Sequence, residues 1–340
     1  MLADKRVSIL GKRMFPFALG TGFGKDLGQD QADRLFDGYV AMGGNLIDTS
    51  LVYYNSEDLL GNWMKARKNR EKVIIQAKGA HHEAHVKRVT PSSILEDLAI
   101  TLKRLQTRYV DIYMLHRDDP DQPVGPIMEA LNQAMEKGSV LALGCSNWTI
   151  PRIEEANLSA TSRGLCGFTV SSPSFSLAFP NAPHWENCVT ACDRFSRAWY
   201  AQAPLAMVPW APLAQGFFKE TFLHPSAFSA DQWRSFLSVP ENREMVRIYY
   251  SERNFERKKR VQRVAGQKGV TPVQLALSWV LNQEKGVCPV VGVRSTDELD
   301  ELAAVISLRL TPEESAWLNL EWETFPSYPD ASSVKITCQR

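Results

Sequence analysis

The sequence has no run of about 18 consecutive apolar residues, the length that a membrane-spanning helix requires. Its first segment, MLADKRVSILGKRM, carries charges throughout and lacks the apolar centre of a secretory signal. The formal net charge is only +1, so no excess of one sign favours nucleic acid or an anionic membrane as a partner. These absences predict a soluble cytoplasmic protein with neither kind of partner.

The six cysteines show no C-x-x-C pair of the zinc or redox kind. They are Cys145, Cys166, Cys188, Cys192, Cys288 and Cys338. Most lie in apolar runs, which favours buried free thiols. Cys188 and Cys192 would share one face of a helix, but a disulfide is not expected without a secretion signal.

Strand and helix patterns alternate along the whole chain. Strands are expected at residues 17–22, 45–50, 73–79, 110–116, from 140, and at 167–173, 205–212 and 286–292. Helices are expected at residues 29–42, 56–67, 91–106, 125–137, 151–162, 184–203, 254–268 and 296–306, after a possible hairpin at residues 6–15. Eight such units with apolar strands predict an α/β fold, a closed (β/α)8 TIM barrel, forming a single domain over residues 1–340.

A doubly wound sheet is the alternative fold. It is disfavoured because Gly20, Gly22 and Gly24 in GTGFGKDLG lack the third spacing of the dinucleotide fingerprint. The one long irregular section, residues 216–251, follows the seventh strand and contains five phenylalanines and one tryptophan. We expect this long loop to form a lid or a pocket wall, with a surface insertion as the alternative, and we expect a C-terminal tail.

Polar side chains follow three consecutive predicted strands. Asp48, Lys78 and His116 stand at the ends of the strands 45–50, 73–79 and 110–116, and Tyr53 follows the first of these. Neighbouring strands lie about 5 Å apart, so a carboxylate, an ammonium, an imidazole and a phenol would converge on one rim of the barrel. Together these groups can protonate a carbonyl oxygen.

The segment GGNLIDTSLVYYNSEDLLG resembles the signature of the aldo-keto reductase superfamily, with Asp48 and Tyr53 at the expected offset. The resemblance continues through IIQAKG, YMLH, GCSN and WAPLAQG in the order typical of that family. It implies an NAD(P)H-dependent enzyme that reduces an aldehyde or ketone reversibly by hydride transfer from the nicotinamide.

The chemistry of the four residues agrees with that role. A nascent alkoxide needs a proton donor, which we expect to be Tyr53, with its pKa lowered by the ammonium of Lys78. Asp48 would keep Lys78 charged, and His116 would orient the carbonyl. Taken singly, the Asp could cap a loop, the Lys could end a strand in solvent and the His could be a bonded core residue.

The resemblance also implies which residues hold the dinucleotide. Those around the nicotinamide and pyrophosphate are Gly20, Thr21, Asp48, Ser146, Asn147, Trp210, Leu213, Gln215 and Gly216. Ser172 stands where relatives carry a glutamine, which weakens one expected contact. At the adenine end we expect Gly292, Arg294, Glu298 and Glu301. Arg294 favours NADPH, although Glu298 would favour ribose hydroxyls, so NADH or dual use is the alternative.

The expected partner is a small carbonyl compound. Tyr54, His81, His82 and Trp148 are the candidate substrate residues. PSFSLAFPNAPHWENC is similar to a bacterial branch of the family associated with carbohydrate metabolism, so an oxidised sugar is a possible substrate. Two alternatives stay open: a non-catalytic protein that senses the nicotinamide, and a metal-dependent barrel hydrolase using His81, His82 and His85, although no metal is expected.

Overall fold

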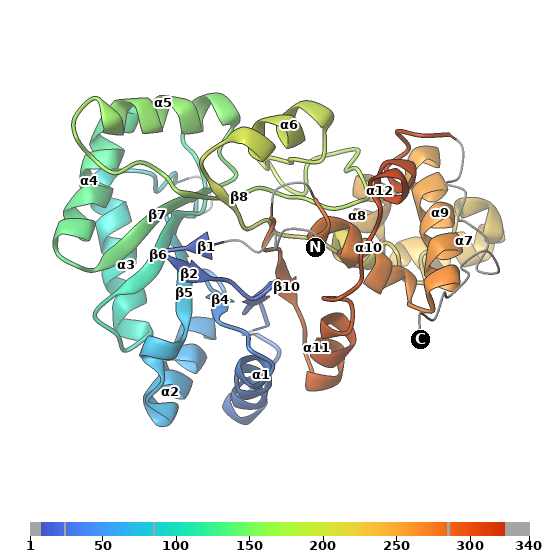
Figure 1. The fold of residues 1–340 in the computed structure, drawn as a ribbon, viewed down its shortest axis with the longest axis horizontal. Helices are drawn as coiled ribbons and strands as arrows, with labels where there is room; N and C mark the ends of the chain where they lie inside the picture. Colours follow the sequence, from blue (N-terminus) through green and yellow to red (C-terminus); the bar gives the residue numbers. More distant parts are fainter. Residues whose placement is uncertain (1–7, 24, 84–85, 284–285, 324–340) are drawn as a thin grey trace, which may run out of the picture.

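The computed structural model describes residues 8–23, 25–83, 86–283 and 286–323 (Figure 1). A short antiparallel hairpin, β1 (Ser8–Ile9) and β2 (Lys12–Arg13), precedes the main sheet. The main sheet contains β3 (Ala18–Gly20), β4 (Leu46–Asp48), β5 (Ile74–Gly79), β6 (Val110–Leu115), β7 (Val140–Ser146), β8 (Val170–Ser172), β9 (Ala206–Met207) and β10 (Val290–Gly292).

These eight strands are parallel and follow the order β10-β3-β4-β5-β6-β7-β8-β9. The two end strands also meet. The amide of Cys288 donates to Met207 O at 3.0 Å, and the amide of Val290 donates to Pro209 O at 2.8 Å. The sheet is therefore a closed barrel, which confirms the predicted fold and excludes the doubly wound sheet, because an open sheet has two edges.

Helices surround the barrel and connect successive strands. They are α1 (Gln29–Ala41), α2 (Ser56–Arg67), α3 (Pro91–Arg104), α4 (Val124–Glu136), α5 (Ile150–Thr161), α6 (Arg194–Gln202), α7 (Ala230–Ser238), α8 (Pro240–Tyr249), α9 (Glu252–Lys268), α10 (Pro272–Leu281), α11 (Thr296–Ala303) and α12 (Pro312–Leu318). Short 3-10 turns lie at η1 (Arg70–Lys72), η2 (Ala214–Gly216) and η3 (Pro225–Ala227). α7 and α9 lie at the opposite end of the long axis from α3 and α4 (Figure 1).

Local signals explain where several helices begin. The hydroxyl of Thr90 accepts from Ser93 N, and Pro91 fills the first turn of α3, where no amide partner is needed. Thr271 and Gln274 form a capping box at α10. These motifs fix the entry of the chain into the helices that cover the barrel.

Two parts of the predicted helix pattern are wrong. The helix expected at residues 184–203 begins only at Arg194, because the carboxylate of Asp193 accepts the amides of Phe195 and Ser196 and caps it there. The section 216–251 is not an irregular loop, because it contains α7 and α8. Both of these helices, together with α10 and α12, were absent from the prediction.

The aromatic residues of 216–251 mostly pack inside the protein. Phe217 is fully buried, whereas Phe228, Trp233 and Phe236 contact one another with ring centres 5.2 to 5.4 Å apart. Only Phe218 of the six lines a described cavity, which is near β10. The segment therefore contributes Phe218, Lys219 and Glu220 to the wall of that cavity, while Phe228, Trp233 and Phe236 form a half-buried aromatic cluster. The expected pocket wall is present, but only one aromatic residue takes part in it.

The barrel has two apolar layers. Its interior is filled by side chains that include Leu46, Ile74, Ile112 and Val170. A larger cluster packs between the strands and the helices, and every residue of β5 and β6 is buried. Burial on both faces explains why these strands read as continuous apolar runs, and why a charged residue at a strand end stands out in the sequence.

The cysteines are free thiols among the described residues, but they are not uniformly buried. Cys145, Cys192 and Cys288 are buried, Cys188 is half-buried and Cys166 is exposed, which corrects the expectation for Cys166. Cys338 and much of the predicted C-terminal tail lie outside the described residues. In the part of the chain that the structure describes, no helix is long and apolar enough to cross a membrane.

Candidate active site

The ends of β4 and β5 place a buried ion pair in the barrel mouth. Lys78 Nζ contacts Asp48 Oδ1, and each residue is only 2% exposed. Gln76 Nε2 also donates to Asp48 Oδ1, at 2.6 Å. Burial by itself lowers the pKa of Lys78, but the charge of Asp48 and the phenol of Tyr53 outweigh it, so the pKa is raised. The ammonium form of Lys78 is therefore the stable one at neutral pH.

Tyr53 lies beside this pair. The centre of its ring is 5.4 Å from Lys78 Nζ and 5.8 Å from the ring of His116. Burial raises the pKa of Tyr53, and the charge of Lys78 together with its hydrogen bond opposes that effect only in part. Without a cofactor or substrate, the pKa of Tyr53 is therefore not below its ordinary value, which corrects the expectation from the sequence. The phenol is protonated at neutral pH, which is the form that can donate a proton.

His116 follows β6 directly and is neutral at the site. Burial, followed by the charges of Lys78, His81 and Arg117, lowers its pKa well below the ordinary value. Its Nδ1 lies 3.0 Å from Ser50 Oγ, and its ring meets the ring of His81 edge to face at 4.8 Å. A neutral imidazole has one N–H, so the bond to Ser50 decides which nitrogen faces the reacting group.

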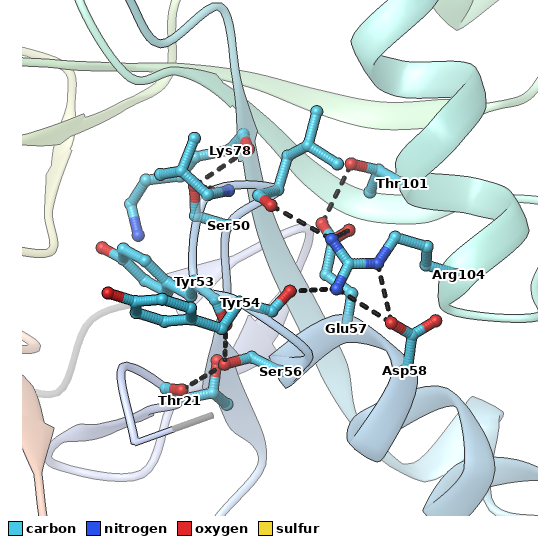
Figure 2. A network of polar contacts seen from close by, with 12 residues as sticks. Thr21, Ser50, Tyr53, Tyr54, Ser56, Glu57, Asp58, Lys78, Thr101 and Arg104 are labelled. Atoms are coloured by element: carbon cyan, nitrogen blue, oxygen red, sulfur yellow. Dashed lines mark hydrogen bonds and ion pairs between the residues drawn. The ribbon is translucent and has the colours of Figure 1, made fainter. Parts of the chain in front are cut away.

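Arg104, from the last turn of α3, holds the loop that carries Tyr53 (Figure 2). Its guanidinium donates to Leu51 O at 3.1 Å and to Tyr54 O, and its Nε donates to Asp58 Oδ2 at 2.9 Å. Tyr54 has a φ of +54°, a left-handed conformation that costs energy for a residue with a Cβ. The bond from Arg104 stabilises this strained turn directly after Tyr53.

Two more contacts fix the same loop. Ser56 Oγ lies 2.6 Å from Tyr53 O and 2.5 Å from Thr21 O, so it ties α2 to the end of β3 (Figure 2). Glu57 is fully buried, accepts from Thr101 Oγ1 at 2.9 Å and lies 3.7 Å from Arg104. Its burial raises its pKa to about 7. Sequence reasoning missed this support because Thr101 and Arg104 lie on α3, more than 40 positions from the loop that they hold.

Several polar atoms around the barrel mouth are buried without a partner. They belong to Thr21 Oγ1, Ser172 Oγ and Trp210 Nε1. Buried polar groups are nearly always bonded, so three such atoms on residues expected to contact a dinucleotide fit a polar ligand at this place. Gly20 is explained by packing of β3 against β10, because a Cβ there would lie 2.8 Å from Val290 Cγ1.

Other residues expected to contact the nicotinamide or the pyrophosphate form hydrogen bonds or ring contacts within the protein. Ser146 Oγ donates to Ser172 O at 2.8 Å, and Asn147 Nδ2 donates to His116 O at 3.3 Å. Gln215 bonds His184 Nδ1 at 3.0 Å. Trp210 has His184 at its edge and Trp185 stacked on it at 4.9 Å. Trp185 and His184 form a rim beside Trp210, and no pattern in the sequence predicts this contact.

A cavity of about 580 Å³ lies between the loop after β9 and the start of α11. Its lining includes the expected residues Leu213, Gly292, Arg294, Glu298 and Glu301. Arg294 N donates to Glu298 Oε2 at 2.8 Å, and the guanidinium lies 3.4 Å from Asp26. A second cavity of about 420 Å³, lined by residues that include Arg70 and Tyr109, lies where β5 and β6 begin, away from the four central residues.

The expected substrate residues behave differently from one another. His81 contacts His116, whereas Tyr54 is 64% exposed and has Lys25 Nζ 5.8 Å from its ring. His82 is half-buried. Trp148 is 1% exposed, packs on Phe168 and donates to Arg117 O, so it is a core residue and not part of a substrate surface. The prediction for Trp148 is wrong because the sequence around a tryptophan at a strand end does not show whether its ring packs in the core or lines the substrate site.

No group of three or more His, Cys, Asp and Glu side chains is arranged to hold a metal ion in the described ranges. His81 bonds the backbone of His82 through Nδ1 at 2.7 Å. His85, the third histidine of the hydrolase alternative, lies outside the described residues.

The chain matches a family of known proteins and is similar in sequence to several of them. A family model described as "Aldo/keto reductase family" matches residues 17–319. The chain is 27% identical to the putative aryl-alcohol dehydrogenase AAD14 of Saccharomyces cerevisiae, over 91% of this chain and 83% of that protein. It is 28% identical to norsolorinic acid reductase B of Aspergillus parasiticus, over 96% and 84%. It is 26% identical to an NADP(+) aryl-alcohol dehydrogenase of Phanerodontia chrysosporium, over 91% and 79%.

Proposed function

Because this chain belongs to the aldo/keto reductase family, and is accordingly an NAD(P)H-dependent oxidoreductase, we propose that it reduces an aldehyde or ketone with Tyr53 as the general acid. In the reverse direction the same residue is the base for alcohol oxidation. The observation that carries the proposal is the position of the buried Tyr53 ring 5.4 Å from Lys78 Nζ, with Lys78 paired to Asp48.

Each residue has one task in this scheme. The bound nicotinamide supplies a hydride to the carbonyl carbon. Tyr53 gives its proton to the carbonyl oxygen, and Lys78 stabilises the phenolate that is left. Asp48 keeps Lys78 protonated through the buried ion pair. His116 is neutral, and its free N–H donates to the same carbonyl oxygen and so fixes the orientation of the substrate.

The residues present fit a dinucleotide. Thr21, Ser172 and Trp210 offer unpartnered buried atoms at the nicotinamide end, and the cavity beside β10 is large enough for the adenosine part. We propose NADPH as the cofactor because Arg294 lines that cavity and can bind a phosphate. The printed name of one relative, which includes NADP(+), supports this choice. NADH is the alternative, since Glu298 lines the same cavity.

The substrate is a small carbonyl compound. The relatives' names mention aryl alcohols and norsolorinic acid, which makes aromatic aldehydes and ketones the first compounds to test. An oxidised sugar stays a prediction of the sequence, as do the bacterial carbohydrate branch and a cytoplasmic location. We further propose that residues 1–340 form one domain.

The test is oxidation of NADPH and of NADH with 4-nitrobenzaldehyde and a panel of oxidised sugars. We expect turnover by the wild-type protein and loss of it in Lys78→Met. Quenching of tryptophan fluorescence by the cofactor shows whether the variant still folds and binds. Cofactor binding by the wild-type protein without turnover of any carbonyl would favour the alternative of a non-catalytic nicotinamide sensor.

A further inference from the structure

Arg117, the residue after His116, is a buried cation that lacks a carboxylate partner. It is only 7% exposed, yet among the residues that the structure describes no carboxylate oxygen lies within 4.0 Å of its guanidinium. Its contacts are weak acceptors: Cys188 Sγ at 3.8 Å and His81 Nε2 at 3.4 Å. Its guanidinium carbon lies 4.7 Å from the ring centre of Trp185.

The two acidic residues that follow Arg117 are bound elsewhere. Asp118 pairs with Arg152, with Nε 3.1 Å from Oδ2. Asp119 pairs with Lys87 at 2.6 Å. The fold therefore satisfies the nearest carboxylates with other cations and leaves Arg117 with its charge uncompensated.

An unpaired buried charge is unfavourable, and proteins keep one mainly where a ligand compensates it. Burial lowers the pKa of Arg117, which shows how strongly its charge is desolvated. A guanidinium also presents a planar set of N–H donors that matches a carboxylate in a bidentate bond. The missing partner is thus an anion that arrives with a bound molecule.

The position of Arg117 points to the substrate and not to the cofactor phosphates. Its guanidinium lies 3.4 Å from Nε2 of His81, whose ring lies 4.8 Å from the ring of His116, so Arg117 is close to the reacting groups. β6, which Arg117 follows, is four places from β10 in the closed ring of eight strands. The cavity proposed for the phosphate-bearing adenosine is beside β10, on the opposite side of the barrel.

We propose that Arg117 binds a carboxylate of the substrate, so that the preferred substrates are aldehydes or ketones that also carry a carboxylate. This inference rests on the proposed carbonyl reduction at the same site. Trp185, which is 42% exposed and lies under the guanidinium, would cover one face of the bound ion pair. His81 and His116 have lowered pKa values because they are buried, so they add no second positive charge that would compete with Arg117 for the carboxylate.

The experiment compares matched substrates that differ in one charge. We would measure kcat/KM for 4-formylbenzoate against its methyl ester, and for 4-oxobutanoate against butanal, in the wild-type protein, Arg117→Met and Arg117→Lys. We expect the wild-type protein to prefer the carboxylate of each pair by roughly 10- to 100-fold, the range of a charged hydrogen bond. Arg117→Met should abolish this preference, and Arg117→Lys should retain part of it.

The control is Arg257→Met. Arg257 is a second buried arginine, 5% exposed, but its guanidinium donates to the amide oxygen of Asn254 on α9 at 3.1 Å, so it has within the protein a strong acceptor of the kind that Arg117 lacks. Its loss should leave the substrate preference unchanged. Melting temperature and fluorescence quenching by the cofactor confirm that each variant folds.

Two results would overturn the inference while leaving the proposed function intact. One is a wild-type protein that reduces the neutral and charged members of each pair equally well. The other is an Arg117→Met variant that loses activity to the same extent on both members, which would mean that Arg117 acts only on Tyr53. Turnover of none of the four compounds would overturn the inference, and if 4-nitrobenzaldehyde and the oxidised sugars are not reduced either, the proposed function falls with it.

Discussion

The hydroxyl of Ser50 lies 3.0 Å from Nδ1 of His116. Ser50 Oγ is also 3.2 Å from Lys78 O, so the same hydroxyl can bond either the backbone or the imidazole. When the hydroxyl donates its hydrogen bond to an unprotonated Nδ1, the single N–H of the neutral imidazole is on Nε2. When the hydroxyl donates to Lys78 O instead, it accepts from Nδ1–H, and Nε2 then has no proton. The direction of the Ser50 bond is therefore coupled to the tautomer of His116, and we assign Ser50 as a positioning residue.

Ser50→Ala is expected to reduce kcat about 10-fold, because one oriented hydrogen bond to the imidazole is lost. The KM for the cofactor should stay the same. Steady-state kinetics with each substrate varied in turn measures both quantities. Thr49→Val is the matched control, since the neighbouring Thr49 Oγ1 has no partner to lose. Equal kcat values for Ser50→Ala and wild type would show that the tautomer does not depend on this bond.

Arg104→Lys is expected to weaken both catalysis and stability. A lysine cannot reach Leu51 O, Tyr54 O and Asp58 together with one planar group, so the turn after Tyr53 loosens. We expect a kcat lower by about 10-fold and a free energy of unfolding lower by about 1–3 kcal/mol. Urea denaturation and steady-state kinetics measure these values.

The control for Arg104 is Arg67→Lys, which alters an exposed pair with Asp37 on the outside of the barrel. That change should leave kcat unaffected. An Arg104→Lys variant with wild-type kcat would contradict the claim that this arginine positions the tyrosine loop.

Glu57 gives the stability of the protein a pH dependence of predictable sign. Its pKa is about 7 in the folded protein against an ordinary value of 4.5, so between these values the folded state binds more protons than the unfolded state. The free energy of unfolding must therefore fall as the pH rises through that window. The full change in the free energy of unfolding is about 3 kcal/mol for a pKa shift of this size.

Glu57→Gln removes this contribution and keeps the shape of the side chain. The difference in free energy of unfolding, variant minus wild type, should rise by roughly 2–3 kcal/mol between pH 5 and pH 8. Urea denaturation at pH 5, 6, 7 and 8 measures it. Taking the difference cancels the opposite effect of the buried neutral histidines. A difference that is independent of pH would show that Glu57 is ionised throughout.

The sequence predicts the closed barrel and the convergence of Asp48, Tyr53, Lys78 and His116 well, because both are encoded locally. A buried strand is a continuous apolar run, and the polar residue that ends it is visible in the sequence. Since all strands are parallel, every strand end comes to the same rim. The residues at successive strand ends therefore meet without any knowledge of the packing around them.

What the sequence could not supply depends on tertiary packing. The pKa of Tyr53 is raised because burial outweighs the charge of Lys78, and burial is known only from the fold. Arg104 is 50 positions from Tyr54, whose carbonyl it bonds. Arg117 is adjacent to a predicted residue, but whether it has a carboxylate partner cannot be read from its neighbours Asp118 and Asp119. The helices α7 and α8 were hidden by the mixed aromatic and polar composition of their segment.

The central proposal is that the phenol of Tyr53 donates the proton to the substrate. The most direct test is the rate of NADPH oxidation at saturating aldehyde in Tyr53→Phe. We predict a rate lower by about 10²- to 10⁴-fold, with quenching of tryptophan fluorescence by the cofactor preserved. Tyr54→Phe, in the exposed neighbour, should keep the wild-type rate within a few-fold. A Tyr53→Phe protein that turns over at close to the wild-type rate would contradict the assignment of this phenol as the acid.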